Sequence, residues 1–144
     1  MSANSRLTVA VHVLTWMALD RRDDGPAATS ERIAGSVNTN PVVIRRCLGE
    51  LRRAGLVESR RGAGAGWNLV REPESITLLD VYRAVEDGTL FRLHPAAPNA
   101  GCPVGHGIGP ALQQVYDGLH SGIERQLAAT TVADVLRDTL ARRR

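Results

Sequence analysis

The segment from Asn40 to Gly55 predicts a single helix with two unlike faces, and no other part of the sequence limits the fold as much. Asn40 suits the N-cap of a helix, Pro41 suits its first position, and Gly55 suits its C-terminal cap. With about 100° per residue, one side collects apolar residues and the other mostly arginines. The apolar side holds Val43, Ile44, Cys47, Leu48, Leu51 and Ala54, and the opposite side holds Val42, Arg45, Arg46, Gly49, Arg52 and Arg53. One side therefore needs a hydrophobic core, and the other predicts a polyanionic partner.

Two helices are predicted before this basic helix. Residues 7–19 carry apolar side chains on more than one side, which indicates a helix buried on several faces. A polar break follows at residues 21–26. Thr29 or Ser30 can then cap a short helix, ERIAGSV, which has one apolar stripe. A brief turn joins this short helix to the basic helix.

Residues 57–70 predict a β-hairpin, because two short extended runs flank a glycine-rich stretch that includes Arg60 and Arg61. A capping box formed by Thr77 and Asp80 then predicts a fourth helix, which we expect to end at Gly88.

The last third of the chain predicts a linker and two helices. Residues 91–110 are rich in glycine and proline and predict a loop or linker, and the sequence leaves open where, between residues 100 and 110, the next helix begins. A long amphipathic helix follows, and Thr131 with Asp134 caps a last one, VADVLRDTL. The long helix carries one apolar stripe, formed by Ile108, Leu112, Val115, Leu119 and Ile123. Neither helix has an evident partner within so small a domain, so we predict that the stripe is a dimerisation surface that packs against a second copy.

The composition suits a globular protein of one compact domain, or of a small domain with an attached oligomerisation element. The net charge of +3 and the pI of about 9.5 are only mildly basic, so the distribution of charge matters more than its total. No apolar run approaches the roughly 20 residues of a membrane helix, and the N-terminal stretch lacks the features of a signal peptide. We therefore expect a cytoplasmic protein without a membrane partner.

The order helix, turn, helix and basic hairpin predicts a winged helix-turn-helix. The expected fold is mainly α with a small β-wing and a long C-terminal dimerisation helix, divided into a DNA-binding domain at 1–73 and a helical dimerisation and sensing region at 74–144. One helix fits the major groove of B-DNA, and arginines at a hairpin tip suit phosphates or the minor groove. We predict double-stranded DNA as the partner, contacted by Ser30, Thr39, Asn40, Val42, Val43, Arg45, Arg46, Arg53, Arg60, Arg61, Gly62 and Gly64.

The run SERIAGSVNTNPVVIRRCLGELRRAGLVESRRGAGAGWNLVREPESITLLDVYRAVED resembles the Rrf2 family of bacterial transcription regulators. The later text PNAGCPVGHGI continues the resemblance, which covers nearly the whole chain. One departure is Ala65, where the wing of the family usually has consecutive glycines. The resemblance implies a homodimer whose two recognition helices and two wings meet a palindromic operator with half-sites about one helical turn apart. We expect a repressor, because a dimer that occupies a promoter blocks polymerase without further contacts.

Many members of the family hold an iron–sulfur cluster on three clustered cysteines, whereas this region has Cys102 alone. We therefore expect no cofactor, and the resemblance is greatest to the cluster-free branch with a single loop cysteine. Cys102 is either a thiol that senses oxidants or a residue that packs under a loop, whereas the position of Cys47 predicts a core residue. A small molecule remains the alternative signal. The histidines are too scattered to predict a zinc site.

Two other functions compete with DNA binding. One is a thiol enzyme with Cys102 as the nucleophile and His106 as its base, although no orienting acid or oxyanion donor is evident. The other is an interaction module that binds a partner protein through its helical stripe. Because the basic helix and the basic hairpin occur together, we favour a regulator with no catalytic residue.

Overall fold

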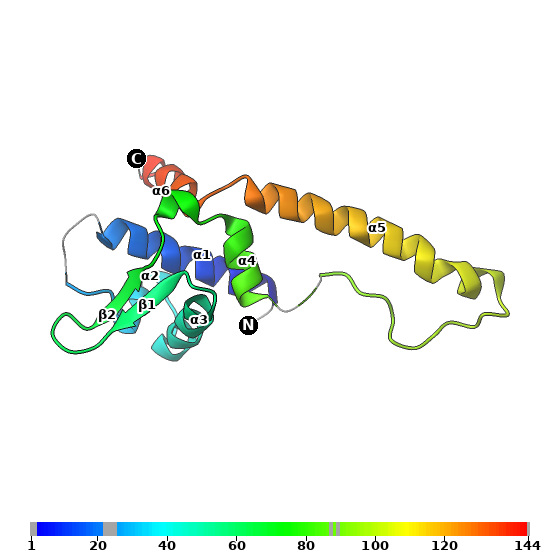
Figure 1. Ribbon diagram of the computed structural model, residues 1–144, viewed down its shortest axis with the longest axis horizontal. Coiled ribbons are helices and arrows are strands. Elements are labelled where there is room, and N and C mark those ends of the chain that lie inside the picture. The colour runs from blue at the N-terminus through cyan, green and yellow to red at the C-terminus, as the bar shows by residue number, and fades with distance from the viewer. Residues whose placement is uncertain (1–2, 22–25, 87, 89, 144) are drawn as a thin grey trace. The chain divides into compact units, whose positions relative to one another are not determined.

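The computed structural model describes residues 3–21, 26–86, 88 and 90–143, and it confirms a mainly helical fold with one two-stranded antiparallel sheet. In chain order (Figure 1), the elements are α1 (Ala3–Asp20), α2 (Ser30–Val37), α3 (Pro41–Arg53), β1 (Val57–Arg60), β2 (Gly66–Leu69), η2 (Pro73–Ser75), α4 (Leu78–Val85), α5 (Pro103–Ala128) and α6 (Val132–Ala141). Residues 1–86 and 127–144 form one compact unit, and residues 87–126 form a second. The predicted polar break falls mostly on residues 22–25, which lie outside the described residues.

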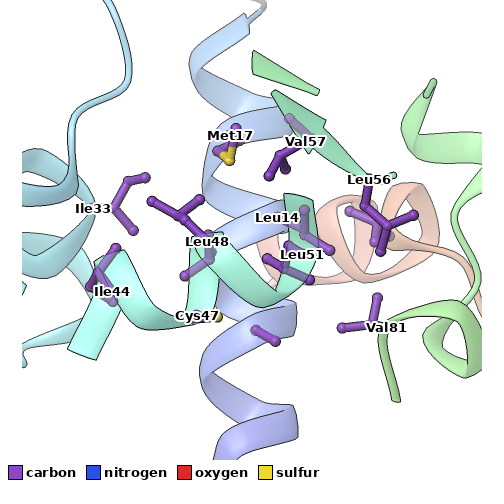
Figure 2. Packing of buried hydrophobic residues seen from close by; sticks show 14 of the residues in the cluster. Leu14, Met17, Ile33, Ile44, Cys47, Leu48, Leu51, Leu56, Val57 and Val81 are labelled. Atoms are coloured by element: carbon purple, nitrogen blue, oxygen red, sulfur yellow. The ribbon is translucent and has the colours of Figure 1, made fainter. Parts of the chain in front are cut away.

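The core of the first unit is built around α1, which packs against α2, α3, α4 and α6. Leu14 of α1 belongs to the same buried cluster as Leu48 and Leu51 of α3, and all three side chains are fully buried (Figure 2). This packing confirms that α1 is buried on more than one face and that the apolar side of α3 faces the core. Ala54 is an exception, because it caps the end of α3 and is exposed.

Local hydrogen bonds determine where the two helices of the helix-turn-helix begin and how the turn between them is formed. The Thr29 hydroxyl accepts a hydrogen bond from the Arg32 amide at 3.2 Å, which identifies Thr29, not Ser30, as the N-cap of α2. Asn38 then adopts a left-handed conformation with φ of 64°, and the Asn40 side chain accepts from the Val42 amide at 2.8 Å to start α3. The turn and the entry angle of α3 thus follow from residues close in sequence.

The wing, which consists of β1, β2 and the turn between them, contacts the rest of the first unit through its backbone. β1 and β2 pair from Val57 with Leu69 to Arg60 with Gly66, and the next amide, that of Trp67, donates to the Ala28 carbonyl at 2.8 Å. A Cβ on Gly66 would lie only 2.7 Å from the Ala28 carbonyl oxygen, so this crossing requires glycine. The predicted hairpin is therefore confirmed, and the first residues of β2 are held against Ala28, just before α2.

One predicted helix boundary is wrong, because α4 ends at Val85 instead of Gly88. The start of α5, which the sequence left open between residues 100 and 110, lies at Pro103. Proline suits the first helical position because its missing N–H has no helical partner there, so the sequence did hold a start signal. Within the described ranges, every helix is too short or too polar to cross a lipid bilayer.

α6 corrects the expectation that neither C-terminal helix has a partner within the chain. Its Val132 and Leu136 are buried in the core, where α6 packs against α1. The Val132 amide donates to the Ile76 carbonyl at 2.9 Å, which brings the start of α6 beside the start of α4. The compact first unit thus includes α4 and α6, whereas the functional division at residue 73 stays a prediction.

Candidate nucleic-acid interface

The outer side of α3 is exposed and carries its arginines. Val42 is 52% exposed, and Arg45, Arg46, Arg52 and Arg53 are all exposed as well. The buried opposite side holds the helix against α1, so the basic side is presented on a rigid support. Neither Arg46 nor Arg53 forms an ion pair with another residue that the structure describes. Both guanidinium groups are thus available to an external anion.

Arg45 differs from Arg46 because it has an acidic neighbour. Its Nη2 atom lies 3.1 Å from Oε1 of Glu31 on α2, and both side chains are more than half exposed. The pKa of Glu31 is lowered by a hydrogen bond with its own backbone amide and by the Arg45 hydrogen bond. Sequence reasoning missed Glu31, since no local pattern joins two residues that are 14 positions apart.

The wing tip adds a second basic region. Arg60 and Arg61 are exposed, and the tip between the strands turns through Gly62 and Gly64, whose φ angles are 83° and 76°. Non-glycine residues rarely adopt these angles, so the glycines allow the tight turn. The wing also meets α3 directly, because the Arg52 guanidinium lies 5.8 Å from the centre of the Trp67 ring. α3 and the wing are therefore in contact with one another.

The other predicted contact residues lie around the start of α3. Asn40 is exposed, whereas Thr39 and Val43 are half-buried. The Asn40 side-chain oxygen is already used in the N-cap, so its amide group is the part left for an external contact. Ser30 is only 6% exposed in the first turn of α2. We therefore leave the Ser30 side chain out of the predicted contacts.

A hollow of about 320 Å³ lies behind α3. It is lined by Arg6, Val9, Val43, Arg46, Cys47, Glu50 and Val85. Arg6 and Glu50 form an ion pair of 2.8 Å at its edge.

Burial, with a smaller contribution from the charge of Glu50, raises the pKa of the Cys47 thiol to about 12. Cys47 is thus the predicted core residue (Figure 2), and it stays protonated at neutral pH.

Cys102 lies in the second unit and is exposed, directly before the first turn of α5. Hydrogen bonds from the backbone amides of Gly105 and Val104 lower the pKa of its thiol. The Cys102 amide donates to the Asn99 carbonyl at 3.1 Å, and a Cβ on Gly105 would lie 2.2 Å from that same carbonyl oxygen. A close contact between Asn99 and Gly105 therefore fixes the thiol at the N-terminus of the helix.

The described donors do not fit an iron–sulfur cluster. Among the residues that the structure describes, no three His, Cys, Asp or Glu side chains are grouped to hold a metal ion. Cluster sites usually take four protein ligands, mostly cysteines, whereas this chain has two cysteines and one of them is buried in the core. His106 donates its backbone amide to the Cys102 carbonyl at 2.8 Å, but a Cys and a His supply at most half of a zinc site.

The family model for Rrf2, described as an iron-dependent transcriptional regulator, matches residues 3–138. YwnA of Bacillus subtilis strain 168, named as an HTH-type transcriptional regulator, is 42% identical over 134 residues, which cover 92% of this chain and 96% of YwnA. The HTH-type transcriptional regulator IscR of Cereibacter sphaeroides is 25% identical over 97% of this chain and 90% of its own. The relatives are regulators and not enzymes, which removes the thiol-enzyme alternative.

Solved structures agree with this comparison. A crystal structure described as a DNA binding protein is 39% identical, with a TM-score of 0.71, and covers 91% of this chain and 98% of its own. The oxidized form of Staphylococcus aureus CymR, at 21% identity, has a TM-score of 0.67 and covers 94% of this chain and 96% of its own. Because only 21% of the residues are identical, the similarity to CymR supports a shared fold and nothing further.

Proposed function

Because the chain belongs to the Rrf2 family of DNA-binding transcriptional regulators, we propose that it acts as a homodimeric repressor that binds a palindromic operator. The observation that supports the DNA surface is the exposed basic side of α3 beside the basic wing tip. Val42 and Arg46 stand on α3, where a recognition helix meets base edges in the major groove. Arg60 and Arg61 stand on the wing, where they suit the phosphate backbone or the neighbouring minor groove.

The proposal of a dimer rests on α5. No residue of α5 is buried within the chain, although Ile108 is 39%, Val115 is 55% and Leu119 is 46% exposed. Leu112 and Ile123 continue the same stripe and are half-buried. Contiguous exposed apolar surface on a helix marks an interaction site, and a second copy with the same stripe is a self-complementary partner.

The test of this proposal is a titration of fluorescent duplexes at several salt concentrations. One duplex is selected by the protein from a randomised pool, and a scrambled duplex is the control. We expect log K for the selected duplex to fall linearly with log salt, with a slope set by about six to eight neutralised phosphates. Failure to select or bind any duplex at low salt would refute the proposal, and binding with half-sites of unrelated sequence would refute the palindrome.

Two arginines are expected to behave differently when replaced. We expect Arg46→Ala to weaken operator binding by about 1 to 3 kcal/mol and to relax the preference at one base pair, because a bidentate contact with guanine is lost. Arg61→Ala should weaken all duplexes alike and reduce the salt slope by about one, because a phosphate contact is lost. Equal losses on operator and scrambled DNA for both variants would exclude base reading by Arg46.

We also propose that oxidation of Cys102 changes DNA binding. The thiolate attacks one oxygen of hydrogen peroxide and the O–O bond breaks, so that sulfur is oxidised to a sulfenic acid and hydroxide leaves. The exposure of Cys102 and the lowered pKa of its thiol both favour this step.

In native protein at neutral pH, iodoacetamide is expected to alkylate Cys102 and to spare buried Cys47, as mass spectrometry of the peptides would show.

Mild peroxide should change the affinity of the wild type for the operator, and dithiothreitol should reverse that change. The affinity of the Cys102→Ser variant should stay the same after peroxide treatment. An equal response of both proteins would exclude Cys102 as the sensor. If neither responds, a small molecule in the hollow behind α3 becomes the better candidate signal.

A further inference from the structure

Two adjacent arginines on the exposed side of α3 are held differently. The Arg45 guanidinium forms an ion pair with Glu31, with 3.1 Å between Nη2 and Oε1. Arg46 has no such pair with any other residue in the described parts of the chain. The exposed side of α3 therefore carries one arginine that is ion-paired and one that, among the described residues, is not.

Stability does not explain the position of Glu31. The Glu31 and Arg45 side chains are 64% and 54% exposed, and ion pairs that are this exposed contribute little to folding. A carboxylate beside a DNA-binding helix also repels phosphates, so it weakens binding to every sequence. An acid at this position is consistent with a role in discriminating between sequences, because it lowers general affinity.

The guanidinium group of Arg45 gives Glu31 a way to affect discrimination between sequences. Arginine has five N–H donors in a planar fork, and it reads guanine by donating two of them to O6 and N7 in one plane. A long unrestrained side chain must lose rotamer freedom to reach this geometry. Because the contact with Glu31 is made by Nη2, the donors on Nη1 and Nε stay available to a base.

We propose that Glu31 is a positioning residue, which orients Arg45 for a bidentate contact with guanine in the major groove. This inference rests on the proposed DNA-binding function. The Glu31 carboxylate is itself well placed, because Glu31 lies in the first turn of α2, directly after the first helical residue and close to the positive end of the helix dipole. Sequence discrimination by α3 thus depends on an acid of α2 that need not touch the DNA.

The experiment is a double-mutant cycle on the full-length protein. Its variants are Glu31→Gln, Arg45→Ala and the combination, and Glu74→Gln is a matched control with the same charge change at an exposed site in η2. The probes are the duplex selected by the wild type from a randomised pool and a set in which each G·C pair of a half-site is replaced by A·T. Thermal unfolding of each variant is measured alongside.

We expect Glu31→Gln to reduce discrimination about three- to tenfold at one G·C pair, the same pair that Arg45→Ala affects, and to leave the unfolding temperature unchanged. In the Arg45→Ala background the Glu31→Gln effect on discrimination should vanish. Glu74→Gln should leave discrimination unchanged in either background.

Two outcomes overturn the inference, and a third would refute the proposed function on which it rests. A Glu31→Gln variant that gains affinity equally for every duplex, in both backgrounds, would show that Glu31 acts only as a negative charge near phosphates. An Arg45→Ala variant with full discrimination would leave nothing for Glu31 to position. Absence of discrimination in the wild type would instead refute the proposed function itself, so the two failures are distinguishable.

Discussion

Replacing Leu119 with glutamate is expected to convert the proposed dimer into monomers and to weaken operator binding by about 100-fold or more. Leu119 is 46% exposed and lies between Val115 and Ile123 in the apolar stripe of α5. In a symmetric dimer, the variant would bury two carboxylates against apolar surface without partners, which is strongly unfavourable. Loss of the dimer removes the simultaneous engagement of two half-sites, and linked sites gain about 10²- to 10⁴-fold in avidity.

Light scattering after size-exclusion chromatography would report the mass, and the titration with the selected duplex would report the affinity. Gln114→Glu is the matched control, because it adds the same charge at an exposed polar position of α5. We expect this control to stay dimeric and to bind DNA nearly as well as the wild type. A dimeric Leu119→Glu variant of unchanged affinity would place the interface elsewhere.

Replacing Leu48 with alanine is expected to lower the free energy of unfolding by about 2 to 5 kcal/mol. Leu48 is fully buried on the inner side of α3, in the core that α3 shares with α1 (Figure 2). The truncation removes apolar contacts and leaves a cavity that the surrounding side chains fill only in part. Urea unfolding at one fixed protein concentration would measure the change, since association also contributes to stability.

Val42→Ala tests the opposite side of the same helix. Val42 is 52% exposed, so its truncation should change the free energy of unfolding by less than about 0.5 kcal/mol. If Val42 contacts a thymine methyl group, this variant should still lose preference for that base pair. A large loss of stability in Val42→Ala, or none in Leu48→Ala, would contradict the assignment of the two faces of α3.

Much of the fold could be predicted because its signals are local. Asn40, Thr77 and Thr131 cap their helices as predicted, since each cap is a hydrogen bond to an amide two or three residues ahead. The two faces of α3 followed from periodicity alone. Where local signals conflicted, the sequence left the boundary open, as with α5, which begins at Pro103 within a stretch rich in glycine and proline.

The candidate site could be predicted only in outline. The periodicity of α3 predicts that Arg46 is exposed, and the position of Arg61 at a hairpin tip predicts the same for Arg61. Both features can be recognised from the spacing of residues in the sequence. The burial of Ser30 and the pairing of Arg45 with Glu31 were not predictable, because both depend on how α2 packs against the rest of the first unit. The thiol environment of Cys102 likewise depends on the contact between Asn99 and Gly105.

The sequence by itself determined the helix-turn-helix, the wing and the basic face, because caps, turns and periodicity act over a few neighbouring residues. Only the tertiary structure decided that α6 packs in the same core as α1, while the stripe of α5 stays uncovered within the chain. An amphipathic pattern shows that a helix must bury one side, but it does not specify which surface covers that side. That choice is made by shape and volume, when elements far apart in sequence compete for one core.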